Sequence, residues 1–322
     1  MMQIIKKDRG FISCWLRTAD ERNIILGQRF LAKDYFCASD DEDYLCNPDS
    51  KFWLYINLTD RCPAACPFCV ARDAMNCSGH ISLEKMKTAL YRIHPILSGV
   101  SITGGEPLTE PACLLEAAEI VHEVAGPDVE LDLATNGYHI SSLNPEMFNH
   151  FTTIHISRHA VSDVDQNRIM GWKAPSIQEL KDWIGKLQDP GLIVFNCVLQ
   201  KGGVENEQDV RNYMEMAANA GVQNVSFISM FDAGQYCRDH YVSPSLLKDI
   251  SGKDKFRIWN AFHDHDFCSC SSGDYLTDKG WTRFYFRCPG KQKTPALRQL
   301  VFTAENILQD GFGPGRREID YD

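Results

Sequence analysis

Residues 62–69 read CPAACPFC and follow an apolar run, FWLYINLTD, at residues 52–60. The run has the length and the aromatic and branched residues of a buried strand, so the cysteines are expected in the loop at its carboxyl end. Ligand-binding groups of parallel α/β folds gather at that edge of the sheet. Thiolates spaced C-x3-C-x2-C suit zinc or an iron–sulfur cluster.

Short apolar runs alternate with helical patterns from residue 52 to 231, which is typical of βα units that build a parallel sheet. Further strands are predicted at residues 99–103, 129–135, 153–157, 192–199 and 222–230. Helices are predicted between them at residues 82–94, 111–124, 144–151, 176–188 and 207–221. Six strands are too few for the usual eight-stranded barrel. We therefore predict an α/β fold with a partial (β/α)6 TIM-like barrel.

The two ends of the chain do not show this alternation of strand and helix patterns. Residues 1–51 form an N-terminal extension whose acidic stretch, DYFCASDDEDYLCNPDSKF, leads into the first strand. Residues 232–322 carry cysteines, aromatic residues and two apolar runs around Ala-Glu-Asn that predict a hairpin. We expect a small C-terminal α+β subdomain that covers the barrel mouth.

The composition of the chain argues against several classes of protein. The net charge of −10 argues against a binder of nucleic-acid polymers or anionic membranes, which carries a basic excess. No apolar stretch is long enough for a signal peptide or a membrane span, so a cytoplasmic protein is expected. In a reducing compartment, clustered members of the 13 cysteines indicate metal or redox chemistry rather than disulfides.

The number of cysteines in the loop decides between metals. A structural zinc site normally closes with four ligands. Cys62, Cys66 and Cys69 can instead hold three irons of a [4Fe–4S] cluster and leave the fourth iron open to a ligand from outside the protein. Phe68 is expected to shield such a cluster from water.

The cysteine loop and several later stretches resemble the radical S-adenosylmethionine (radical SAM) superfamily. The matching stretches are CPAACPFC, TGGEP at residues 103–107, ATNG at 134–137, ISRH at 156–159 and NCVLQKGG at 196–203. The last resembles members related to the molybdenum-cofactor GTP cyclase and the sulfatase-maturing enzymes. The resemblance covers residues 52–231 and implies reductive cleavage of S-adenosylmethionine (SAM) to a 5′-deoxyadenosyl radical, which abstracts a hydrogen atom from the substrate.

The resemblance also implies residues that bind SAM. Gly104, Gly105, Glu106 and Pro107 match the motif that approaches the amino group of the methionine moiety. Ser157 corresponds to a residue that contacts the ribose or the carboxylate, and Arg158 is expected to pair with the methionyl carboxylate. Asn136 and Asn196 complete the predicted cofactor-binding set, together with Phe68.

Related enzymes place auxiliary iron–sulfur clusters in a C-terminal region, and Cys268, Cys270 and Cys288 are candidate ligands of a second cluster. Their first pair is spaced C-x-C, whereas C-x2-C is usual, so a plain cysteine-bearing loop is the alternative. Cys237 is a candidate fourth ligand or a donor of a hydrogen atom to a substrate radical. His159 is expected to be a core histidine rather than a catalytic one.

We expect a radical SAM enzyme that modifies a peptide, with a nucleotide or another small polar metabolite as the alternative substrate. An electron donor such as flavodoxin or ferredoxin is the implied partner. The alternative from another class is a non-catalytic iron–sulfur or zinc protein. The TGGEP stretch argues against that alternative, because an electron carrier needs no strand end that binds SAM.

Overall fold

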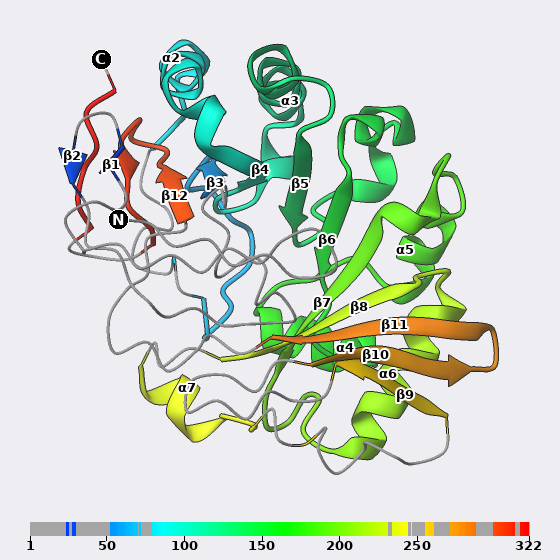
Figure 1. The fold of residues 1–322 in the computed structure, drawn as a ribbon. Coiled ribbons are helices and arrows are strands. Elements are labelled where there is room, and N and C mark those ends of the chain that lie inside the picture. Colours follow the sequence, from blue (N-terminus) through cyan, green and yellow to red (C-terminus); the bar gives the residue numbers. More distant parts are fainter. Residues whose placement is uncertain are drawn as a thin grey trace, which may run out of the picture.

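A computed structural model describes most of the chain (Figure 1). The described residues are 24–25, 28–29, 52–69, 71, 79–230, 234–243, 246, 255–260, 271–287, 299–312 and 316–321. In the part before residue 52, β1 (Ile24–Ile25) and β2 (Gln28–Arg29) form a short antiparallel pair. No helix among the described residues has the length and apolar character needed to cross a membrane.

Six parallel strands form the middle of the main sheet and lie side by side in chain order. They are β3 (Phe52–Asn57), β4 (Leu97–Thr103), β5 (Glu130–Thr135), β6 (Thr153–Ser157), β7 (Ile193–Leu199) and β8 (Asn224–Ser229). Each lies within, or overlaps, one of the six predicted segments. The predicted α/β fold with a parallel sheet is confirmed, and the curved sheet of Figure 1 fits a partial TIM-like barrel.

Helices connect these strands, and α2, α3 and α5 lie along the outer side of the sheet (Figure 1). They are α2 (Leu83–Ile93), α3 (Pro111–Ala125), α4 (Asp163–Met170), α5 (Ile177–Ile184) and α6 (Glu207–Asn219), and the short α7 (Gln235–Asp239) follows β8. Ser82 caps α2, and Ser176 begins α5 with a capping box closed by Glu179. The predicted helix at residues 144–151 is a 3-10 helix, Pro145–His150, and α4 was not predicted.

The two faces of the six strands differ in chemistry. One face is apolar and packs against the helices, as Phe227 of β8 does against Tyr213 of α6. The other, inner face carries Tyr55, Ser101, Asp132, His155, Ser157, Asn196 and Ser226, which the register places on the same side. A parallel sheet buried on both sides by apolar layers has near-continuous apolar strands. The polar alternation here shows that the inner face is not a second apolar layer of the core.

Strands from the C-terminal part extend the same sheet at both ends. The strand β12 (Gln299–Phe302) lies parallel to β3 and forms a hairpin with β13 (Leu308–Gln309), so the predicted hairpin is confirmed. The strand β11 (Gly280–Arg287) lies parallel to β8 and continues into β10 (Ser271–Thr277) and β9 (Phe256–Asn260). These strands cover the open edges of a partial barrel. The described C-terminal strands thus belong to the same sheet as the barrel strands, and the expected C-terminal subdomain over the barrel mouth stays a prediction.

Candidate active site at the carboxyl ends of the strands

The three-cysteine loop lies at the carboxyl end of β3, where the sequence predicts it. Cys62, Cys66 and Cys69 are each partly buried, and the Cys69 N–H donates to the Cys66 carbonyl at 3.1 Å. The N–H of Ala65 donates to the carbonyl of Met170 at 2.8 Å. The loop is therefore held by the C-terminal end of α4 as well as by its own turn.

The buried thiols of this loop favour the binding of a cation. Burial raises the pKa of the Cys62 thiol to about 11, with smaller contributions from Glu106 and Cys69. Burial raises that of Cys66 to about 12, and Cys69 and Cys62 add to the shift. Iron supplies the positive charge that these thiolates need, and its binding displaces their protons. The donor set therefore fits an iron–sulfur cluster.

Within the described parts of the chain, no three His, Cys, Asp or Glu side chains are grouped closely enough to hold one metal ion.

Asn136, one of the predicted cofactor residues, reaches the cysteine loop. Its Nδ2 donates to the Sγ of Cys62 at 3.6 Å, and its side chain is buried. Hydrogen bonds to cluster sulfurs tune the reduction potential of iron–sulfur centres. Cys62 follows β3 and Asn136 follows β5, so the ends of two strands on either side of β4 meet at this thiol.

Gly104 and Gly105 let the end of β4 approach the loop that follows β3. Gly104 has φ +131°, and a Cβ there would lie 2.6 Å from the carbonyl oxygen of Thr59. A Cβ on Gly105 would collide with the carbonyl of Arg61. The Gly105 N–H donates to the Thr59 carbonyl at 2.6 Å. The two glycines thus serve backbone packing beside the cysteine loop, whatever their role toward SAM.

Glu106 is a buried carboxylate that joins the ends of β4 and β5. It accepts hydrogen bonds from Thr135 Oγ1 at 2.5 Å, Asn136 N at 2.6 Å and Leu108 N at 2.9 Å, and it is 1% exposed. Burial raises the pKa of Glu106 to about 7, and these hydrogen bonds oppose the shift. The adjacent Pro107 is buried at the start of a 3-10 helix, Pro107–Thr109.

Arg158 does not lie where the sequence analysis places it. The guanidinium is fully buried and donates to the carbonyls of Ala160, at 2.9 Å, and Val161, at 2.9 Å. It also forms an ion pair with Asp163 at 2.7 Å. Successive side chains of a strand alternate between its two faces, so residue 158 lies on the same side as Ile154 and Ile156, which face the helices. The Arg158 side chain therefore does not lie on the inner face. The expected pairing of Arg158 with a SAM carboxylate is therefore corrected to a structural role.

The helix α4 braces the cysteine loop through Gln166, which the sequence analysis missed. Gln166 is 1% exposed, and its Oε1 accepts from the N–H of His159 at 2.6 Å. Its Nε2 donates to the carbonyl of Ser157 at 3.0 Å and contacts Met170 Sδ at 2.8 Å. Since Met170 accepts the N–H of Ala65, Gln166 connects the end of β6 to the loop.

We predict that Gln166→Leu lowers the free energy of unfolding by about 1–3 kcal/mol, because it leaves the His159 N–H and the Ser157 carbonyl buried without this partner. Iron retained per chain after reconstitution is expected to fall as well. Val164→Ala is the matched control, since Val164 lies on the same helix and is 78% exposed. Urea denaturation and iron analysis measure both effects. Equal losses in the two variants would contradict the bracing role.

His159 is a core histidine, as expected. It is 4% exposed, its Nδ1 accepts from the N–H of Val198 at 3.2 Å, and its ring meets Phe68 edge-on at 5.0 Å. Burial, with a smaller contribution from Arg158, lowers the pKa of His159 from 6.5 to about 3. The neutral ring therefore persists in the folded protein at neutral and mildly acidic pH.

This pKa predicts a specific acid sensitivity. Between pH 6.5 and about 3 the unfolded chain binds a proton that the folded chain does not. The stability from neutral His159 is thus fully present above pH 6.5 and is lost as the pH falls. His159→Gln, which cannot protonate, is expected to lose about 2 kcal/mol less than the wild type between pH 7.5 and 5.0. Urea denaturation at both pH values measures it, and parallel curves would contradict the assignment.

The remaining predicted residues lie around the same strand ends or outside the described residues. Asn196 is on the inner face, where its Oδ1 faces His155 Nδ1 at 3.2 Å. Ser157 ends β6 next to Asn196 in register. Cys237 lies on α7 and is 2% exposed. Cys268, Cys270 and Cys288 fall outside the described residues.

The short helix α7 lies near the cysteine loop. The Tyr236 hydroxyl donates to the Oε1 of Gln200 at 2.8 Å, just after β7. Burial raises the pKa of Tyr236, and Cys66 is among the smaller causes of the shift, so the two side chains lie within electrostatic range. Sequence periodicity carried no signal for this five-residue helix.

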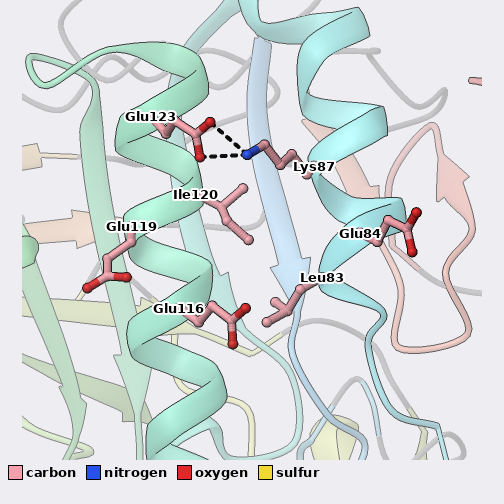
Figure 2. A pocket seen from close by; sticks show the side chains of 7 residues that line it. All are labelled: Leu83, Glu84, Lys87, Glu116, Glu119, Ile120 and Glu123. Atoms are coloured by element: carbon pink, nitrogen blue, oxygen red, sulfur yellow. Dashed lines mark hydrogen bonds and ion pairs between the residues drawn. The ribbon is translucent and has the colours of Figure 1, made fainter.

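A groove of about 440 Å³ lies elsewhere, on the outer surface between α2 and α3 (Figure 2). Its walls carry four glutamates, and Lys87 bridges to Glu123 across it at 2.6 Å. None of the cysteine-loop or strand-end residues lines it. This groove therefore has no part in the candidate active site.

Comparisons with known proteins agree with this geometry. The family model described as "Radical SAM superfamily" matches residues 56–217. GTP 3',8-cyclase of Rhodopseudomonas palustris (strain ATCC BAA-98 / CGA009) is 25% identical over 206 residues, which are 61% of this chain and 58% of the relative. The enzyme of the same name from Pseudomonas entomophila (strain L48) is 21% identical over 282 residues, 77% of this chain and 82% of the relative. This chain thus spans less than two thirds of the first relative.

A solved structure shares the fold. The crystal structure of Streptococcus suis SuiB bound to S-adenosylmethionine superposes with a TM-score of 0.55 at 11% identity, over 84% of this chain and 63% of that chain. At this identity the likeness concerns the fold alone.

Proposed function

Because the chain belongs to the radical SAM superfamily, we propose that this enzyme cleaves SAM at a [4Fe–4S] cluster and abstracts a hydrogen atom from a substrate on the inner face of its sheet. The observation that carries the proposal is the group of three partly buried cysteines at the carboxyl end of β3. The amide of Asn136, directed at one of their sulfurs, supports it.

Cys62, Cys66 and Cys69 would each bind one iron and leave the fourth iron for SAM. When bound, such a cluster supplies the electron that cleaves SAM into methionine and the 5′-deoxyadenosyl radical. The task of the protein is then to bind, orient and exclude water. Phe68, held edge-on against His159, would shield the cluster side of the loop, and Asn136 would hydrogen-bond a cluster sulfur.

Glu106 would receive the amino group of the methionine moiety, beside Gly104, Gly105 and Pro107. Its three partners are neutral donors, and a carboxylate offers about four acceptor positions. An ammonium group would fill the remaining position and supply the missing positive charge. Ser157 would then contact the ribose or the carboxylate of SAM, since Arg158 is engaged within the protein.

We favour a peptide as the substrate. The inner face of β3–β8 carries no Lys or Arg among its described residues, and its strands present hydroxyl, amide, imidazole and carboxylate groups. Such hydrogen-bonding groups suit peptide amides, whereas a nucleoside triphosphate needs cationic partners.

A nucleotide is the second candidate, and two observations favour it. The curated relatives named above are GTP 3',8-cyclases. Arg283 of β11 is in register with Asn224 of β8, so it shares the inner side of the sheet at its far end. Its side chain is 47% exposed.

Three further roles remain proposals. Cys268, Cys270 and Cys288 would bind a second cluster, which would raise the iron content from about four to about eight per chain. Cys237 would donate a hydrogen atom to the substrate radical. A flavodoxin or ferredoxin would deliver the electron. We also keep the division into residues 1–51, 52–231 and 232–322 as a proposal.

Stimulation of SAM cleavage distinguishes the substrates. The reconstituted, reduced holoenzyme is incubated with SAM and either a pool of N-acetylated, C-amidated hexapeptides or GTP, and 5′-deoxyadenosine is measured over time. We expect the peptide pool to raise the rate above the substrate-free rate and GTP to leave it unchanged. Stimulation by GTP alone would replace the peptide proposal with the nucleotide one.

A further inference from the structure

A layer of polar side chains crosses the inner face just below the carboxyl ends of the strands. Ser157, Asn196 and Ser226 stand next to one another in register on β6, β7 and β8. Asp132 and His155 lie beside them on β5 and β6, on the same face. We call these five residues the inner polar layer.

The contacts of His155 with Asp132 and Asn196 bear on which atoms of Asn196 remain for a ligand. His155 Nε2 lies 3.4 Å from Asp132 Oδ2, and His155 Nδ1 lies 3.2 Å from Asn196 Oδ1. Both ring nitrogens therefore face side-chain oxygens. When His155 Nδ1 carries the hydrogen and donates to Asn196 Oδ1, Asn196 has the N–H groups of its Nδ2 left for a ligand.

Ser226 adds an unused group at the same level. Its side chain is 1% exposed, and its Oγ has no hydrogen-bond partner among the described residues. A buried hydroxyl without a partner is destabilising, so such groups usually mark a ligand or an ordered water. Because Ser226 is in register with Asn196, the two residues lie side by side on the inner face.

We propose that the inner polar layer is a subsite that binds a carbonyl oxygen of the substrate, with Asn196 Nδ2 and Ser226 Oγ as its donors and the Asp132–His155 pair as positioning residues. The ligand class is an uncharged amide, such as the backbone of a peptide. This inference rests on the proposed function and specifies which part of the substrate the inner face recognises.

Charge supports an amide over a carboxylate or a phosphate. Asp132 is the acidic member of the layer, and the described inner face of β3–β8 has no Lys or Arg to balance an anionic ligand. An anion beside Asp132 would meet like charge with only His155 to offset it. A neutral carbonyl oxygen accepts the two donors without that penalty.

The test compares two serines on one strand. Ser226 and Ser229 of β8 are both 1% exposed with unpartnered hydroxyls, but Ser229 has the parity of Phe227 and faces the helices. Binding of N-acetylated, C-amidated hexapeptides to the holoenzyme with SAM is measured by ultrafiltration and mass spectrometry. We expect Ser226→Ala to weaken retention of the bound peptides about tenfold and Ser229→Ala to leave it unchanged.

Asn196→Asp is the second variant, because it keeps the shape and exchanges the N–H donors for oxygen. It is expected to reduce peptide retention at least as much as Ser226→Ala does. SAM affinity and 5′-deoxyadenosine formation are measured on the same samples. Equal peptide retention by all four proteins, or a loss confined to SAM affinity, would overturn the inference while SAM cleavage stands. If the wild-type protein does not cleave SAM, the proposed function itself is wrong.

Discussion

The variant Cys66→Ser is expected to lose the cluster and to slow SAM cleavage by at least about 10³-fold. The Cys66 thiol is half-buried between two other cysteines, and burial raises its pKa to about 12. Iron compensates for that cost when it binds the thiolate. A serine hydroxyl stays protonated and is a hard oxygen ligand, which does not replace a thiolate on an iron–sulfur cluster.

Cys113→Ser is the matched control for this prediction. Cys113 is a partly buried free cysteine on α3, and burial also raises its pKa, to about 11. Its replacement is expected to leave iron content and absorbance of the reconstituted protein at the wild-type level. If Cys66→Ser keeps the wild-type iron content, or if both variants lose iron equally, the assignment of the loop is wrong.

The second large effect concerns stability. Arg158→Met is expected to lower the free energy of unfolding by about 3–5 kcal/mol, because it removes a buried cation that holds several backbone carbonyls. The carbonyls of Ala160 and Val161 would lose their donors, and Asp163 would lose its partner. These groups shape the turn between β6 and α4, so iron retention is expected to fall with stability.

Arg168→Met is the control, because the Arg168 side chain is 55% exposed and pairs with Asp165 at 3.1 Å on the surface. An exposed pair of this kind contributes about 0–1 kcal/mol. Urea denaturation of both variants gives the difference, and SAM affinity is measured beside it. A stable Arg158→Met protein that has lost only SAM affinity would restore the carboxylate-pairing role that the structure argues against.

The sequence was sufficient to predict the strands and the cysteine loop, because both are local signals. Apolar runs such as residues 192–199 read as strands without knowledge of their neighbours, and the three cysteines follow the first run directly. The serines at residues 82 and 176 likewise marked two helix starts. These features depend on residues close together in the chain.

Most of the contacts that could not be predicted join residues far apart in the chain. The helix α4 is short and mostly polar, and its buried residue Gln166 acts through partners on β6. Arg158 is the exception: it resembled a ligand residue by motif, although the alternation after Ile156, a local signal, placed its side chain on the side that faces the helices. Which strand end supports which thiol depends on register, and the bond from Asn136 to Cys62 spans 74 positions. No local pattern carries that information.

Formation of 5′-deoxyadenosine tests the central claim most directly. Anaerobically reconstituted protein is reduced with dithionite and incubated with SAM, and 5′-deoxyadenosine and methionine are quantified beside the protein in which Cys62, Cys66 and Cys69 are all replaced by alanine. The proposed cluster site predicts brown wild-type protein that forms both products in equal amounts, and a triple variant that holds less iron and forms neither product. Iron-loaded wild-type protein that leaves SAM intact, or a triple variant that still cleaves it, would contradict the account.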